Sequence, residues 1–250
     1  MHIYDDRFFD WVDSGARRSA RALLPHVQRA VRLESVLDVG CGRGTWLAVW
    51  QEIGIEDVVG IDGDYVRRDK LAIPADRFVV TDLRAARVDR KFDLVQSLEV
   101  GEHIAPSCSD AFVALLCAAG DVVFFSAAQP GQGGEMHVNE QTPEFWAGLF
   151  ARHGFERYDC IRHYVASDRR IEPWYRYNSF IFANEIGRTR LSPEAAAAHL
   201  PASLTAPDFG GFVWWVRRLV LRRMPTTAVT LLSRLNYRVV TVLRAFQVIG

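Results

Sequence analysis

Val36-Leu37-Asp38-Val39-Gly40-Cys41-Gly42-Arg43-Gly44-Thr45 is the stretch that decides the fold. Its apolar start is typical of a buried strand, and the acidic, glycine-studded turn leads into a helical pattern. Glycines let the backbone bend sharply and let a ligand approach the main chain. The spacing is G-x-G-x-G, and Thr45 interrupts the dinucleotide pattern G-x-G-x-x-G. The stretch therefore predicts a small-ligand loop, and Asp38 beside it favours a cationic amine over a diphosphate.

Strand patterns continue outward from this loop. Apolar runs lie at 35–39, 57–61, 77–81, 92–97 and 121–126, and helical patterns near 44–53, 64–70 and 106–118 alternate with them. Such alternation specifies a mostly parallel sheet with helices on both faces. Asp62 and Asp82 follow the second and third runs. In open parallel sheets ligands bind beyond the carboxyl ends of the strands, so both carboxylates are candidates for ligand contact.

The D-x-G-x-G-x-G loop, the two acidic strand ends and the run Phe92–Glu99 together resemble the motifs of class I S-adenosylmethionine-dependent methyltransferases. The resemblance covers roughly residues 1–185 and implies S-adenosylmethionine as the cofactor. It implies an α/β fold, a Rossmann-like, doubly wound, seven-stranded and mostly parallel sheet that ends in an antiparallel hairpin, here runs 155–163 and 177–183. Asp62 would accept the ribose hydroxyls, and Asp82 would lie near the adenine amino group. The residues expected to bind the cofactor are Asp38, Gly40, Cys41, Gly42, Gly44, Asp62, Gly63, Asp82, Leu83, Ser97 and Tyr4.

Four segments are expected along the chain. Residues 1–32 form an N-terminal helical cap of two or three short helices, interrupted by Gly15 and Pro25. Residues 33–186 form the methyltransferase domain, in which Thr142 is placed to cap a helix that continues to Arg152. A linker with a short helix spans 187–211, and 212–250 form a basic, amphipathic helical tail.

Three residues are candidates for catalysis. His137 lies in the glycine-rich loop after the fifth strand and has a side chain that titrates near neutral pH, which suits a general base. Its alternative role is to anchor the loop through a backbone carbonyl. His103 follows the fourth strand and either faces the acceptor or caps the next helix. Glu99 either meets the donor or acceptor or accepts backbone amides at the strand end.

A magnesium site of the kind found in the catechol-type branch of the family needs clustered carboxylate and amide oxygens. The segments after the strands offer Glu99 and His103 in place of the required aspartates. We therefore expect no metal ligands and a metal-independent enzyme.

The composition bounds the class of protein. At 250 residues and 49% hydrophobic, the chain can bury one substantial core. A net charge of zero argues against nucleic acid as a partner, since that binding needs a basic surface. Four cysteines without C-x-x-C spacing indicate neither a zinc site nor a disulfide framework, and the N-terminus lacks a secretion-signal pattern. We expect a cytoplasmic protein.

The tail differs from the rest of the chain in charge. After Asp208 there is no acidic residue, while arginine recurs among tryptophans and aliphatic residues in 212–223 and 227–248. A basic amphipathic pair of helices could lie on an anionic membrane, which would make the protein peripheral to the inner membrane. It could equally pack as a lid or form a homodimer interface, and all three roles stay open.

Taken together, these patterns favour a methyltransferase that acts on a small-molecule or saccharide acceptor in a natural-product or glycan pathway. We expect O-methylation, with N- and C-methylation as alternatives. Two other classes compete: a nicotinamide-dependent oxidoreductase, which the interrupted glycine pattern disfavours, and a non-catalytic S-adenosylmethionine-binding scaffold. Donor motifs alone do not separate the scaffold from the enzyme.

Overall fold

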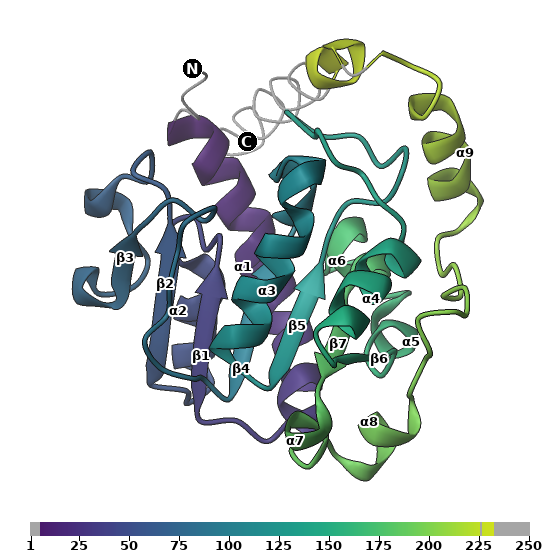
Figure 1. Cartoon of the computed structure of the whole chain (residues 1–250). Helices are drawn as coiled ribbons and strands as arrows, with labels where there is room; N and C mark the ends of the chain where they lie inside the picture. Colours follow the sequence, from purple (N-terminus) through teal and green to yellow (C-terminus); the bar gives the residue numbers. More distant parts are fainter. Residues whose placement is uncertain (1–5, 226, 233–250) are drawn as a thin grey trace.

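The computed structural model describes residues 6–225 and 227–232, with side chains described from Asp13 onward. Its centre is a seven-stranded sheet in the order β3-β2-β1-β4-β5-β7-β6 (Figure 1). The strands are parallel except β7, which runs antiparallel to both β5 and β6. Their bounds are β1 (Ser35–Val39), β2 (Asp57–Asp62), β3 (Phe78–Val80), β4 (Leu94–Leu98), β5 (Val122–Ser126), β6 (Glu156–Tyr158) and β7 (Phe180–Ala183). This arrangement confirms the predicted fold class.

Helices cover both faces of the sheet (Figure 1). Alternate strand residues point to opposite faces, and both faces are buried: Val36 lies in the core that includes α1 and α2, whereas Leu37 lies in the core with α3 and α4. A parallel sheet with near-continuous apolar strands requires this double cover. The helices are α1 (Asp6–Ala30), α2 (Thr45–Glu52), α3 (Ser109–Ala119), α4 (Pro143–Arg152), α5 (Arg162–Val165), α6 (Pro173–Asn178), α7 (Glu185–Arg188), α8 (Pro193–Ala197) and α9 (Phe212–Leu221).

The N-terminal segment corrects one expectation, because it forms a single helix, α1, and not two or three short ones. Pro25 lies inside it, where a proline typically costs about 3 kcal/mol. Leu23, Leu24 and Val27 around the proline are completely buried, and burial of such side chains outweighs that cost. Gly15 does not interrupt the helix; its missing side chain leaves room for Glu172, whose Oε1 would lie 3.1 Å from an added Cβ.

Other boundaries differ in the irregular parts of the chain. The predicted helix at 64–70 is reduced to one 3-10 turn, Arg68–Lys70. The predicted strands at 155–163 and 177–183 are shorter, since α5 takes up residues 162–165 and α6 ends only at Asn178. The helix after Thr142 is confirmed, and the Thr142 hydroxyl accepts a hydrogen bond from the Phe145 amide.

Beyond β7 the chain returns to the sheet edge. The guanidinium group of Arg157 donates to the carbonyls of Pro201 and Leu204, and Arg162 donates to that of Pro207. Much of the expected linker is thereby held against the catalytic domain. The predicted helix at 212–223 is found as α9, whereas most of the predicted helix at 227–248 lies outside the described residues. None of the helices described here is both long and apolar enough to cross a bilayer.

Candidate active site

The glycine loop connects β1 to α2 with an unusual backbone. Gly40, Gly42 and Gly44 all have positive φ angles, of 82°, 55° and 78°. At Gly40 a side chain is excluded twice, by this conformation and by Val100, whose Cγ2 would lie 2.5 Å from an added Cβ. The loop amides therefore lie at the carboxyl edge of the sheet, where the residues after β2 and β4 meet them.

Asp62 at the end of β2 organises this loop. It is 3% exposed, and its carboxylate accepts hydrogen bonds from the amides of Gly42 and Gly63, each at 2.6 Å. The Tyr65 hydroxyl donates to the same carboxylate. Burial raises the pKa of Asp62, and these hydrogen bonds oppose the shift. A carboxylate that accepts a phenolic hydroxyl is chemically suited to accept a ribose hydroxyl, so the group expected for the cofactor fits here.

Asp38 lies behind the loop and does not face outward. It is 3% exposed and accepts a hydrogen bond from Gln96 Nε2 at 3.0 Å, while Gln96 Oε1 accepts one from Trp50. Burial raises the pKa of Asp38 to about 8, although the Gln96 hydrogen bond works against this. The sequence did not indicate this buried polar chain, because its members come from three separate elements.

The other residues predicted for the cofactor lie in different environments. Ser97 is buried and donates to the Val39 carbonyl, so its hydroxyl links β4 to β1. Cys41 is buried, and burial raises the pKa of its thiol. Asp82 is exposed and is paired with Arg84, whose hydrogen bonds lower the carboxyl pKa to about 2. Leu83 packs partly buried against the α3 and α4 side of the core, and Tyr4 lies outside the described residues.

Glu99, directly after β4, has a conformation that marks it as unusual. Its φ is 56°, a left-handed value that costs a side-chain-bearing residue energy and often occurs at functional sites. Its carboxylate accepts hydrogen bonds from Gln132 Nε2 at 2.7 Å and Asn178 Nδ2 at 3.3 Å. Burial raises the pKa of Glu99, and hydrogen bonds from these partners and Ser126 oppose the shift. A charged or proton-sharing carboxyl is thus fixed at the strand end.

Glu102 is the most unusual group in the site. It is completely buried, and neither carboxylate oxygen accepts a hydrogen bond from the described residues. The Ala128 amide and the Glu99 carboxyl lie nearby without forming such a bond. Burial, and then the charge of Glu99, raise the pKa of Glu102 well above its ordinary value. A buried carboxyl without a donor is costly, so its presence calls for a ligand or a proton.

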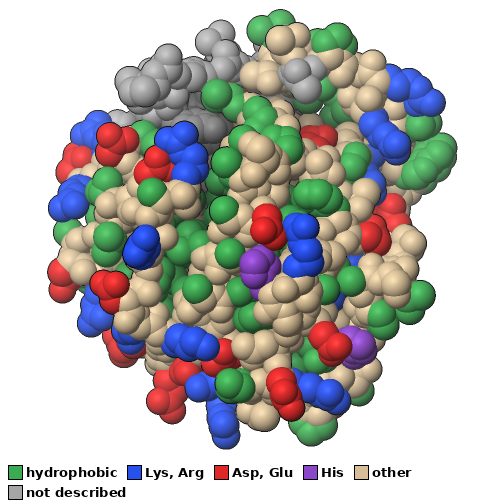
Figure 2. Space-filling model, viewed as in Figure 1, with side chains coloured by type: hydrophobic (Ala, Val, Ile, Leu, Met, Phe, Trp, Pro, Cys, Tyr) green, Lys and Arg blue, Asp and Glu red, His purple; other side chains and the backbone are tan. Residues whose placement is uncertain are grey.

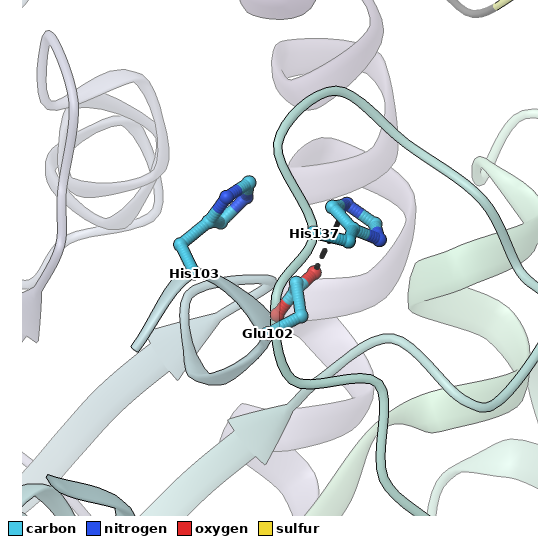
Figure 3. A group of neighbouring side chains, drawn as sticks. All are labelled: Glu102, His103 and His137. Atoms are coloured by element: carbon cyan, nitrogen blue, oxygen red, sulfur yellow. Dashed lines mark ion pairs between the residues drawn. The ribbon is translucent and has the colours of Figure 1, made fainter. Parts of the chain in front are cut away.

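His137 and His103 complete the cluster (Figure 3). The Nδ1 atom of His137 lies 2.9 Å from Glu140 Oε1, and its Nε2 atom lies 3.9 Å from Glu102 Oε1. The rings of His103 and His137 are 5.0 Å apart and nearly perpendicular. Although the His103 ring reaches solvent, its packed surroundings and His137 lower its pKa to about 4, so the ring is neutral at pH 7.

Glu140 holds the His137 loop in place. It accepts hydrogen bonds from the amides of Gly131 and Gly133, both at 2.8 Å. Burial raises its pKa, but the hydrogen bonds from His137 and these amides outweigh burial, and the net shift is downward. An ionised Glu140 only accepts, so His137 donates to it through Nδ1–H, and its other nitrogen, Nε2, lies on the side of Glu102.

The structure thus brings the three catalytic candidates, Glu99, His103 and His137, together. It adds four residues to which the sequence had assigned no role: Glu102, Gln132, Glu140 and Asn178. Glu102, Gln132 and Glu140 lie in the same sequence stretches as the predicted catalytic residues, and this proximity could have indicated them from the sequence. Asn178 precedes β7 and could not be connected to the site without the tertiary structure.

A cavity of about 500 Å³ lies elsewhere, along α1. It touches the start of α2 at Thr45 and is otherwise lined by α1, Ala72 and Arg170. Arg17 and Arg21, which line it, are paired with Glu52, and Arg18 is paired with Glu172. This cavity is therefore distinct from the Glu102 cluster, and its cations are largely neutralised.

Comparison with known proteins agrees with this geometry. The family model described as methyltransferase domain matches residues 12–160, more than half of the chain. Streptomyces venezuelae DesVI has a TM-score of 0.53 and 16% identity, covering 70% of this chain and 96% of its own. The methyltransferase domain of bacterial CtHen1-CN has a TM-score of 0.51 and 18% identity, covering 67% and 99%. At these identities the likeness concerns the fold, and no curated protein matches the chain. With its glycine loop, acidic β2 end and sheet order, the chain belongs to the methyltransferase-domain family and is an S-adenosylmethionine-dependent methyltransferase.

Proposed function

We propose that the enzyme transfers the methyl group to a hydroxyl of a small-molecule or saccharide acceptor. The observation that carries this proposal is the cluster of Glu99, Glu102, His103 and His137 next to the glycine loop. A neutral amine attacks a sulfonium without help from a base, whereas a hydroxyl is a poor nucleophile unless a base removes its proton during attack. A group of histidines and carboxylates with perturbed pKa values is suited to that proton transfer.

The roles of the residues follow from their contacts. S-adenosylmethionine supplies the electrophilic methyl group. Asp62 would hold its ribose, and the main chain of the glycine loop would contact the cofactor directly. His137 would accept the acceptor's proton at Nε2, because Glu140 fixes its proton on Nδ1. Alignment of nucleophile, methyl carbon and sulfur supplies most of the rate enhancement, and the base contributes a further factor of about 10² to 10⁴.

Replacing His137 by alanine tests this assignment. We expect turnover to fall by about 10² to 10⁴, because the proton acceptor is lost, while affinity for S-adenosylhomocysteine stays within about twofold. The measurement is methyl transfer from labelled donor to a panel of sugars and other hydroxylated compounds, with calorimetry for the donor product. His153→Ala is the matched control, since His153 also pairs with a carboxylate, Asp110, away from the site.

The same assay separates the alternatives. Product analysis that places the methyl group only on nitrogen or carbon would replace O-methylation by one of those reactions. If S-adenosylhomocysteine binds but no acceptor in the panel is methylated, the scaffold hypothesis gains and the enzymatic proposal fails for these acceptor classes. Unchanged turnover in His137→Ala would return this residue to the role of a loop anchor.

A further inference from the structure

Glu102 is a buried carboxyl whose surroundings the proposed function does not explain. A buried carboxyl normally has donors around it, yet both of its oxygens have no hydrogen-bond partner in the described part of the chain. A proton shared with Glu99 would satisfy one oxygen. The other oxygen, Oε1, lies 3.9 Å from Nε2 of His137, which is too far for a hydrogen bond. A carboxylate oxygen and a ring nitrogen at this separation can both coordinate a cation placed between them.

A third donor completes the arrangement. One ligand atom each of Glu102, His103 and His137 lies within 4.8 Å of the other two (Figure 3). Donor atoms around an ion at 2.0–2.2 Å lie about 3 to 3.6 Å apart, so a contraction of roughly 1 Å would bring the three into coordination.

The surroundings of His137 supply an independent indication. Metal-binding histidines usually donate their second ring N–H to a carboxylate, which fixes the tautomer and the ring orientation. Glu140 accepts this hydrogen bond and is itself held by the amides of Gly131 and Gly133. Gly134 adds to the fit, because a Cβ at that position would clash with the imidazole at Nε2.

We propose that Glu102, His103 and His137 form a binding site for one divalent transition-metal ion. Two imidazoles and one carboxylate suit zinc, iron or manganese, whereas magnesium prefers a shell of oxygens. Three protein ligands leave positions open for an acceptor hydroxyl. This inference rests on the proposed function for its catalytic consequence and revises the expectation of metal independence. The ion would activate the acceptor in place of His137 as a base, and His137 would be one of its ligands.

The chemical step is then balanced without a further reactant. The acceptor hydroxyl binds the ion, and its pKa falls toward neutrality as that of metal-bound water does. The oxygen releases its proton to bulk water, attacks the methyl carbon, and the carbon–sulfur bond breaks with its electron pair going to sulfur. His137 is a ligand in this step, so its loss removes both the ion and the activation.

The test is calorimetric titration of the full-length, chelator-treated protein with Zn²⁺, and with Mg²⁺ for comparison. We expect one Zn²⁺ per chain, at least 100-fold tighter than Mg²⁺. Glu102→Gln and His103→Ala should each weaken Zn²⁺ binding more than about tenfold, and Glu140→Gln by about 10- to 100-fold through the orientation of His137. His153→Ala should bind Zn²⁺ like the wild type, because its carboxylate pair lies outside the cluster.

Two results would overturn the inference: no stoichiometric Zn²⁺ binding, or binding that all three variants retain. Circular dichroism shows whether each variant folds; if Glu102→Gln does not, the partly exposed His103 still carries the test. Titration of the same samples with S-adenosylhomocysteine keeps the two proposals apart. Donor binding without Zn²⁺ binding sinks the metal site alone, whereas Zn²⁺ binding without methyl transfer leaves the site and sinks the proposed function.

Discussion

At the scale of single residues, Asp62 holds the glycine loop and is expected to bind the ribose of the cofactor. Replacing it by alanine removes the acceptor for two loop amides and for the expected ribose hydroxyls, so S-adenosylhomocysteine should bind about 1–3 kcal/mol more weakly. Calorimetry measures this, with Asp69→Ala as the control because Asp69 is an exposed aspartate after the same strand. Equal affinity in Asp62→Ala and the wild type would remove Asp62 from the donor site.

Asp38 makes a prediction about pH. Its folded-state pKa, about 8, is above its ordinary value of 3.8, so the folded protein holds this proton more tightly than the unfolded chain. The stability that Asp38 contributes, as free energy of unfolding, is therefore fully present at low pH and is lost as pH rises from about 4 to 8.

Asparagine at this position mimics the protonated form and still accepts the Gln96 hydrogen bond. Relative to the wild type, Asp38→Asn should gain about 3 kcal/mol in free energy of unfolding between pH 5 and pH 8. Denaturant unfolding at several pH values measures the difference. A difference that stays constant with pH would mean that Asp38 is ionised in the folded protein throughout this range.

At the scale of elements, α9 holds the loop after β5. Arg217 donates to the Gln132 carbonyl and Arg218 to that of Pro130, while Gly131 packs directly against the backbone of Arg218. Gln132 in turn donates to Glu99. The helix α9 is therefore connected to the candidate site through this loop, although it contributes no side chain to the Glu102 cluster.

Gly131→Ala tests this connection. Gly131 has a φ of 83°, and a Cβ there would clash with the Arg218 backbone, so the variant should lose both stability and turnover. Gly54→Ala is a matched control: its φ is 98°, but nothing lies within 4 Å of an added Cβ. The control should show only the conformational cost, about 1–2 kcal/mol, at full turnover. Equal effects of the two substitutions would argue against a role for the α9 contact.

At the scale of the whole molecule, the outer side of α9 is unusually apolar and basic. Figure 2 shows hydrophobic and arginine side chains next to one another over this helix. Phe212 is 76% exposed, Val213 81% and Trp215 52%, and Arg222 and Arg223 are exposed beyond them. Contact with an anionic membrane and contact with a second copy of the chain both stay predictions for this surface.

Vesicle sedimentation distinguishes the two. The full-length protein should sediment with vesicles that contain anionic lipid, less so in high salt, and Phe212→Ser with Trp215→Ser should reduce binding at least fivefold by removing apolar contacts. Neutral vesicles are the control. A protein that ignores both kinds of vesicle, yet has twice the mass of one chain by light scattering, would assign this surface to a homodimer.

The sequence by itself determined the sheet, the donor loop and the cofactor. These depend on local patterns. Apolar runs with turn residues between them predict β1 to β5, the loop glycines adopt positive φ angles, and Asp62 is the last residue of β2. The predictions from sequence were wrong where packing between distant residues overrides local preference. One example is α1, which continues through Pro25 because the residues around this proline are buried.

Only the tertiary structure revealed the cluster around Glu102. Glu102 looks like any charged residue in a turn, but the fold buries it completely beside His137, and among the described residues neither of its oxygens has a hydrogen-bond donor. Likewise, Asn178 joins Glu99 only because β7 returns beside β5. Burial and the pairing of charges depend on contacts between residues far apart in the chain, and no local sequence pattern encodes them.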